Sequence, residues 1–171
     1  MTNLATYSKL CALEEASRLF RYAPLTRDSE EGKRILYLTP YAKEWLYPKR
    51  KHPEGVGDDA LAKADAVLTA FVRGKTLLDG QDLKHLEKRL IPLDREAWEF
   101  RTGLDLKKHQ LRLFGWFPDA NHFVLVHGKK RGDLSTDAAW EKAIRRVVDD
   151  RRALLPDVPL FRGMSYGDYI N

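Results

Sequence analysis

Basic side chains are concentrated between Trp98 and Arg131, and they give this stretch a clearer chemical character than any other part of the chain. Lysine and arginine neutralise phosphate groups, so such a concentration is typical of a surface that binds a polyanion. Gathered in one small sheet, these charges would form a cationic face opposite an apolar one. The basic residues of the stretch are Arg101, Lys107, Lys108, Arg112, Lys129, Lys130 and Arg131.

His127 lies at the end of an apolar run, two residues before the basic segment Lys129–Arg131. A histidine in this position is either a structural side chain with satisfied hydrogen bonds or a proton donor and acceptor in catalysis. The basic segment is either a solvated turn or a phosphate clamp. We favour the clamp because the predicted sheet places it beside Arg101 and Arg112.

The sequence contains no second pattern that predicts a reaction centre. Its five histidines have no pairing at i, i+4, and its single cysteine, Cys11, excludes an intramolecular disulfide and a cysteine-based zinc site. It also lacks a glycine-rich phosphate loop and a nucleophile elbow. We therefore expect no metal and no cofactor.

The composition favours a folded protein of the cytoplasm. The 171 residues carry a net charge of +5 and are 43% hydrophobic, enough for a packed core and suited to acidic partners. No apolar run approaches the roughly 18 residues that a membrane span needs, so we expect no membrane partner. The first residues, MTNLATYSKL, do not have the pattern of a signal peptide.

The basic stretch reads as three strands, which would hold its side chains in place. They are predicted at Trp98–Arg101, His109–Phe117 and His122–His127, with turns at Gly103 to Asp105 and at Pro118 to Asn121. Two short turns in succession predict an antiparallel meander, since parallel strands need a longer crossover.

The remaining segments predict an α+β fold with helices packed on one face of the sheet. An accessory helix and loop occupy residues 1–33, a central domain residues 34–155 and a tail residues 156–171. Within the domain we expect a strand at 34–39, a helix that begins at Thr39-Pro40 and ends near 48, and a helix at 59–73 capped by Gly74. We also expect a short helix carrying Leu83, Leu86 and Leu90, and a last helix at 137–155, capped by Ser135 or Thr136.

Four segments in this order resemble the RelE/ParE superfamily of bacterial toxins, within its RelE/HigB branch. They are LYLTPYAKEWL, FVRGKTLLDGQDLKHL, WEFR and FVLVHGKKRGDLST followed by WEKAIRR, and the resemblance covers residues 34–154. Members share a strand, two helices, a three-stranded meander and usually a closing helix. The resemblance therefore implies a RelE/ParE-like meander with an extra N-terminal helix.

What the resemblance implies about function is a toxin held in check by a cognate antitoxin. RelE-like members cut mRNA at the ribosome without a metal, whereas ParE-like members inhibit gyrase. A tyrosine near the C-terminus often completes the site, and Tyr166 or Tyr169 would serve if the tail folds back. One departure is that His127-Gly128 runs straight into Lys129. The catalytic candidates that the resemblance assigns are Arg101, Arg112, His127, Lys129, Lys130 and Arg131.

The segment QLRLF also resembles the pentapeptide by which bacterial proteins bind the DNA polymerase sliding clamp, as in a toxin that blocks replication. Its defining residues are Gln110, Leu111, Leu113 and Phe114. Such a motif inserts apolar side chains into a pocket. In a strand, however, Leu111 and Leu113 point to one face and Gln110, Arg112 and Phe114 to the other. The segment is thus either a core strand with a basic outer face or an exposed clamp-binding peptide.

Overall fold

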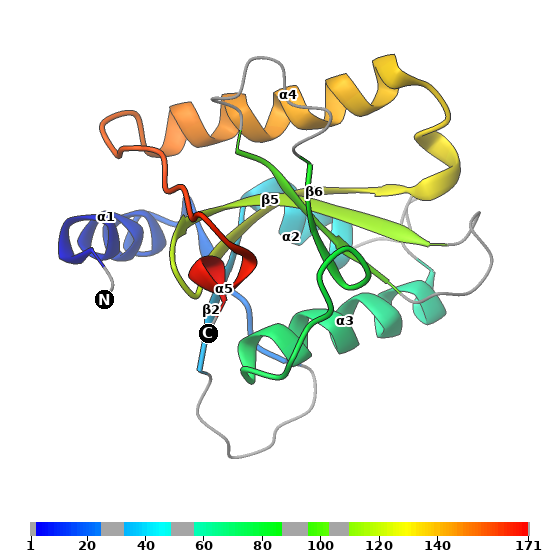
Figure 1. Cartoon of the computed structure of the whole chain (residues 1–171), viewed down its shortest axis with the longest axis horizontal. Coiled ribbons are helices and arrows are strands. Elements are labelled where there is room, and N and C mark those ends of the chain that lie inside the picture. The colour runs from blue at the N-terminus through cyan, green and yellow to red at the C-terminus, as the bar shows by residue number, and fades with distance from the viewer. Residues whose placement is uncertain (1–2, 25–32, 49–56, 87–95, 103–109, 171) are drawn as a thin grey trace.

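The computed structural model describes residues 3–24, 33–48, 57–86, 96–102 and 110–170, and a six-stranded mixed sheet organises them (Figure 1). The strand order across the sheet is β1-β2-β6-β5-β4-β3. The predicted α+β class is confirmed. The strands are β1 (Phe20–Arg21), β2 (Ile35–Leu38), β3 (Leu83–His85), β4 (Trp98–Arg101), β5 (Leu111–Asp119) and β6 (His122–Lys130). The helices are α1 (Leu4–Glu15), α2 (Pro40–Leu46), α3 (Asp58–Val72), α4 (Asp137–Leu154) and α5 (Tyr166–Tyr169).

The meander predicted for the basic stretch is present as β4, β5 and β6, each antiparallel to the next. Asp119 pairs with His122, so the β5–β6 hairpin turns over two residues, and Asn121 there has a positive φ of 60°. Asparagine tolerates that conformation better than most residues. Strand β2 pairs with β6 in parallel, which α2 and α3 permit by carrying the chain back across the sheet.

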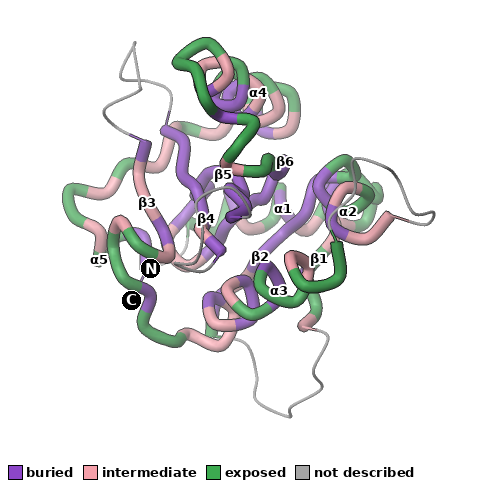
Figure 2. Tube along the Cα trace, turned by 90° about the vertical axis from the view of Figure 1, so that its right-hand side faces the viewer, coloured by how far each residue is buried: buried purple, intermediate pink, exposed green. Residues whose placement is uncertain are grey.

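Helices cover both faces of the sheet, so the prediction that they pack on one face is wrong (Figure 1). Residues of α2, α3 and α5 form the α3-side core, and residues of α1 and α4 form the α4-side core. Strand β5 supplies Leu111, Leu113 and Phe117 to the first, and Phe114 and Trp116 to the second. Every residue of β5 is buried (Figure 2). A strand that is apolar on both faces needs a helix layer on each.

The structure confirms the helix ends that were predicted from capping residues. The Thr39 hydroxyl accepts a hydrogen bond from the Ala42 N–H at 3.2 Å, and Pro40 opens α2. Thr136 caps α4 in the same way, through the Ala139 N–H at 3.2 Å. Gly74 follows α3 with a positive φ of 68°, which costs glycine nothing.

The accessory helix is followed by a strand, and one predicted helical segment is a strand instead. The N-terminal helix ends at Glu15, Ser17 takes a positive φ of 55°, and Phe20–Arg21 then pairs with β2. Leu83–His85 pairs with β4, because that edge of the sheet offers hydrogen bonds that a single helical turn cannot match. Leu90 lies outside the described residues.

The terminal segments contribute side chains to the two cores of the sheet. Leu10 and Leu13 of α1 are buried beneath the α4-side face. The tail folds back: Tyr169 is buried in the α3-side core, and its carbonyl accepts a hydrogen bond from the Asn121 N–H at 2.8 Å. Among the described residues, no helix combines the length and the hydropathy of a bilayer span.

The pairing of β5 with β6 shifts register at two places, and the first shift lies between Phe114 and Gly115. Phe114 pairs with His127 but Gly115 pairs with Leu125, so Val126 is an extra residue, a β-bulge. A Cβ on Gly115 would stand 2.1 Å from the Val124 carbonyl oxygen and 2.5 Å from the Phe123 ring. The bulge therefore requires glycine at this position.

Gly115→Ala is expected to lower the free energy of unfolding by about 1–3 kcal/mol, because backbone and ring must both move to admit a methyl group. Gly167→Ala is the matched control, since the nearest atom that its Cβ would meet is the Ser165 hydroxyl at 3.8 Å. Urea unfolding followed by circular dichroism measures both. Equal stabilities for the two variants would contradict the packing described around Gly115.

Candidate functional site

Three basic side chains lie in a row across neighbouring strands on the α4-side face of the sheet. Arg101 of β4 pairs with Arg112 of β5, and Arg112 pairs with Lys129 of β6. Directly paired residues share a face, and neighbouring strands are about 4.8 Å apart. Like charges in such positions destabilise a sheet. We call Arg101, Arg112 and Lys129 the cationic row.

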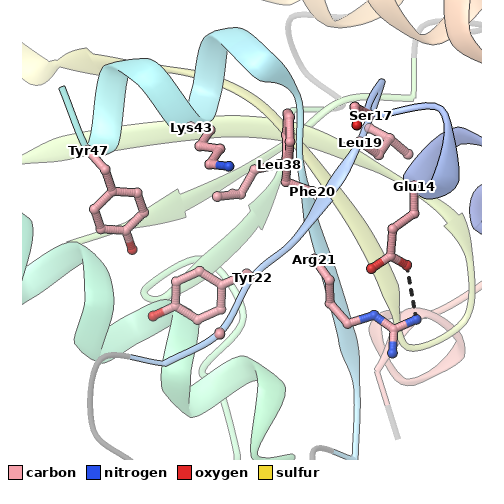
Figure 3. Close-up of a pocket in the computed structure, with 10 residues that line it drawn as sticks. Glu14, Ser17, Leu19, Phe20, Arg21, Tyr22, Leu38, Lys43 and Tyr47 are labelled. Atoms are coloured by element: carbon pink, nitrogen blue, oxygen red, sulfur yellow. Dashed lines mark hydrogen bonds and ion pairs between the residues drawn. The ribbon is translucent and has the colours of Figure 1, made fainter. Parts of the chain in front are cut away.

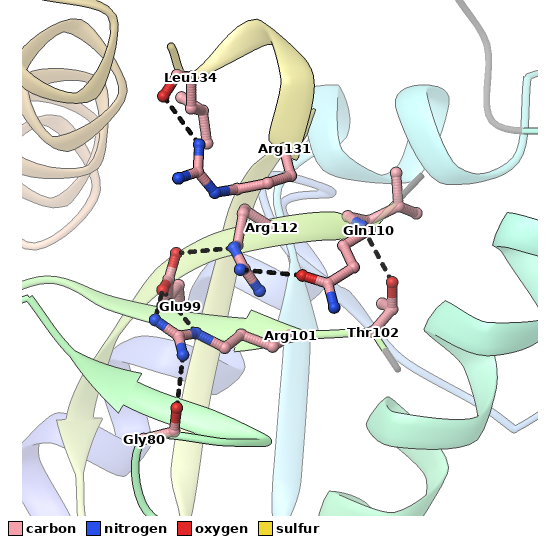
Figure 4. A network of polar contacts seen from close by, with 9 residues as sticks. Gly80, Glu99, Arg101, Thr102, Gln110, Arg112, Arg131 and Leu134 are labelled. Carbon is pink, nitrogen blue, oxygen red and sulfur yellow. Dashed lines mark hydrogen bonds and ion pairs between the residues drawn. The ribbon is translucent and has the colours of Figure 1, made fainter. Parts of the chain in front are cut away.

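One carboxylate contacts both arginines of this row (Figure 4). Glu99 is fully buried, with 0% of its surface exposed. Its Oε1 lies 2.8 Å from both Nε and Nη2 of Arg101, and its Oε2 lies 3.7 Å from Nε of Arg112. Arg101 also donates to the Gly80 carbonyl. A single carboxylate therefore contacts two guanidinium groups, the buried one of Arg112 and the half-buried one of Arg101.

Arg112 is the least compensated member of the row. Its Nη2 donates to the Gln110 side-chain oxygen at 3.1 Å, but Nε and Nη1 are buried and make no hydrogen bond to the described residues. Only 7% of the residue is exposed. Burial lowers its pKa, as do the positive charges of Arg101 and Arg131, while Glu99 raises it. A buried cation without its full set of acceptors favours binding of an anion nearby.

The other two basic candidates divide between the faces of the sheet. Arg131 remains near the row: its Nη1 donates to the Leu134 carbonyl at 3.0 Å, and its guanidinium lies 5.7 Å from the Trp140 ring centre. Lys130 pairs with Leu111 of the α3-side core and therefore points to the opposite face from Lys129. Lys129 and Lys130 belong to β6, so the predicted loop begins only at Arg131.

His127 lies beneath α4 rather than on an open surface. It is 1% exposed, its ring stacks on Phe114 at 4.9 Å between centres, and its Nε2 donates to the Ala143 carbonyl at 3.0 Å. Burial lowers its pKa to about 4, so the imidazole is neutral at physiological pH. Burial beneath α4 favours the structural interpretation of His127 and removes the residue from reach of a substrate at the row, although its Nδ1 is buried without a hydrogen bond to the described residues.

The residues of the clamp-like pentapeptide are all buried in the central strand or next to it. Leu111 and Leu113 belong to the α3-side core and Phe114 to the α4-side core, while Gln110 holds Arg112. Strand β5 is paired on both edges, with β4 and β6. Insertion of QLRLF into a partner's pocket would therefore require β5 to leave the sheet.

Sequence reasoning missed Glu99, although its signal was present. In Trp98-Glu99-Phe100-Arg101, alternation places the glutamate and the arginine on one face and the two aromatic rings on the other. A carboxylate two residues before a candidate arginine is a natural partner for it. Tyr166 and Tyr169, the predicted C-terminal contributors, lie at the α3-side core, not at the row.

Cavities occur away from the row. One of about 320 Å³ lies beside β1 and is lined by Phe20, Tyr22, Lys43 and Tyr47, with the Arg21–Glu14 ion pair of 3.2 Å at its margin (Figure 3). It contains none of the predicted site residues. In the part of the chain that the structure describes, no cluster of three or more His, Cys, Asp and Glu side chains has the arrangement of a metal site.

The buried imidazole predicts a specific dependence of stability on pH. The unfolded chain takes up a proton at His127 below about pH 6.5, whereas the folded protein does so only near pH 4. Stability from this residue is therefore complete above pH 6.5 and is lost as the pH falls towards 4. The loss between pH 7 and pH 5 is about 2 kcal/mol.

His127→Gln keeps an N–H donor for Ala143 but does not titrate. The difference in unfolding free energy between the native protein and this variant should therefore shift by about 2 kcal/mol between pH 7 and pH 5, in favour of the variant at pH 5. Urea unfolding at the two pH values measures it. A difference that does not change with pH would show that His127 is not held neutral.

Comparison with known proteins adds no relative to this description. No family model matches the chain, and neither the curated proteins nor the solved structures contain a significant match to it.

Proposed function

We propose that the protein is the toxin of a toxin–antitoxin pair and that it acts on RNA through the cationic row. The observation that carries the proposal is the buried, incompletely bonded guanidinium of Arg112, flanked in register by Arg101 and Lys129. Repulsion between these like charges lowers the stability of the sheet, and binding of a phosphate chain relieves that repulsion. The overall charge of +5 acts in the same direction by attracting a polyanion.

The order of the elements supports a RelE/ParE-like toxin. Strand β2 is followed by two helices, then by the meander β4-β5-β6 and the closing helix α4, which is the order that the resemblance implies. Strands β1 and β3 extend the sheet at its two edges, and α1 packs on the α4-side core. On this proposal a cognate antitoxin is the partner that silences the protein, and ribosome-bound mRNA is its target.

The residues of the row have different parts in this function. Lys129 is exposed and contacts a phosphate directly. Arg112 is buried and attracts the phosphate through its electrostatic field. Glu99 pairs with both arginines, which offsets their mutual repulsion and orients them. With His127 under α4, the described part of the row provides charge stabilisation, not proton transfer. RNA binding is therefore the primary activity proposed, and metal-independent mRNA cleavage is its extension.

Lys129→Ala should weaken binding of a single-stranded RNA by roughly 3- to 10-fold and reduce the slope of log K against log salt by about 0.7. Lys130→Ala is the matched control, because it removes the same charge from the same strand but on the opposite face. Fluorescence anisotropy at several salt concentrations measures both. Equal losses in the two variants would indicate a diffuse charge effect and contradict the row.

Induction in cells without the antitoxin should reduce incorporation of labelled amino acids before that of labelled thymidine, because an RNA-directed toxin stops translation first. Lys129→Ala should relieve growth arrest and Lys130→Ala should not. The sliding-clamp alternative gives the opposite order, with thymidine incorporation falling first and Gln110→Ala relieving arrest. A loss of thymidine incorporation with translation intact would overturn the RNA proposal.

A further inference from the structure

A second cavity, of about 350 Å³, lies on the opposite face of the sheet from the cationic row, at the edge formed by β3 and β4. This volume is within the range of sites for small organic ligands. The C-terminal segment 162–169 closes one side of it. Its buried floor is formed by Glu96, Trp98 and Tyr169, and its exposed rim by Asp79, Arg162 and Met164.

The floor holds a carboxylate, Glu96, and a buried donor, the Trp98 indole N–H. Glu96 directs one oxygen to the protein: Oε2 lies 3.0 Å from His85 Nε2 and accepts from the Tyr169 hydroxyl at 3.3 Å. The Trp98 indole N–H is buried and has no acceptor among the residues that the structure describes. Unused buried polar groups are costly, and a ligand that pairs with them offsets that cost.

Aromatic rings surround these polar groups. The rings of His85 and Trp98 are 4.8 Å apart, and those of Trp98 and Tyr169 are 4.5 Å apart, centre to centre. Tyr166 lines the same cavity. Aromatic walls combined with a mixed set of donors and acceptors suit a planar heteroaromatic ring, and unstacked RNA bases are read in this way.

We propose that this cavity is a base pocket for guanine in a single-stranded RNA, an inference that rests on the proposed RNA-directed function. The pairing edge of guanine carries an acceptor oxygen, a ring N–H and an amino group. Trp98 N–H complements the oxygen, and the carboxylates of Glu96 and Asp79, which line the cavity, complement the two donors. Uracil offers one donor on that edge, and the amino group of adenine has no ring N–H beside it.

The pocket and the cationic row meet at the edge of the sheet. Arg101, at one end of the row, donates to the Gly80 carbonyl, and Asp79, the preceding residue, lines the pocket. A single strand that passes over this turn reaches both. The row then holds the backbone, while the pocket selects the base, which is the division of labour general in nucleic-acid recognition.

Titration of the full chain with nucleosides tests the pocket without involving phosphate. Guanosine should bind, with inosine weaker because it lacks the amino group, and uridine weakest. Glu96→Gln should weaken guanosine binding by about 10- to 100-fold through loss of a charged acceptor. Glu14→Gln, at the opposite edge of the sheet, should leave guanosine binding unchanged.

The Trp98 indole N–H resonance provides a second readout in the native protein, assigned from its absence in Trp98→Phe. It should move on addition of guanosine but not of uridine, whether or not Glu96→Gln folds. If RNA binds with the expected salt dependence but guanosine gives no shift, or shifts the resonance no more than uridine does, the base pocket is overturned and the RNA proposal stands. If neither RNA nor guanosine binds, both are overturned.

Discussion

The pairing of β5 with β6, together with the register shift at Val126, determines which side chains meet on each face of this protein. Without the extra residue Val126, strict alternation from Val124 would turn Lys129 towards the α3-side face. The bulge reverses the alternation. It places His127 under α4 and Lys129 beside Arg112, and it rests on Gly115, where a side chain has no space. The candidate site therefore depends on a glycine that touches no ligand.

The central position of β5 explains why the charge on Arg112 is effective. A guanidinium at a sheet edge would be solvated, and its field would be screened by water and salt. In β5 it is flanked by strands on both sides and is buried with Glu99. Removal of one charge from a buried ion pair leaves the other charge unpaired, so the Glu99–Arg112 contact is costly to break. The same burial that anchors the arginine also concentrates its field at the row.

The sequence predicted those parts of the fold whose signals are local. Capped helix ends such as Thr39-Pro40 and Gly74, and the strand at Trp98–Arg101, have short-range chemical causes. The helix predicted to carry Leu83 is wrong, because a segment as short as Leu83–His85 shows no hydrophobic periodicity. Its conformation is determined by pairing with β4. The second helix layer could have been inferred, since Phe114 and Trp116 share a face with Arg112. The bulge was not predicted, although Gly115 within a strand is a signal for one, and without it the side that His127 and Lys129 occupy was undetermined.

The contact between Asn121 and the Tyr169 carbonyl has a consequence for the order of folding. The β5–β6 turn is held by a residue almost fifty positions later in the chain, and the buried ring of Tyr169 packs on Trp98 and Phe117. During synthesis the N-terminal part of a domain emerges first. Here the α3-side core remains open, and the wall of its cavity is missing, until Tyr169 has been translated and released from the exit tunnel. During synthesis, completion of the α3-side core and fixing of the β5–β6 turn are therefore coupled, because both wait for the same residue, Tyr169.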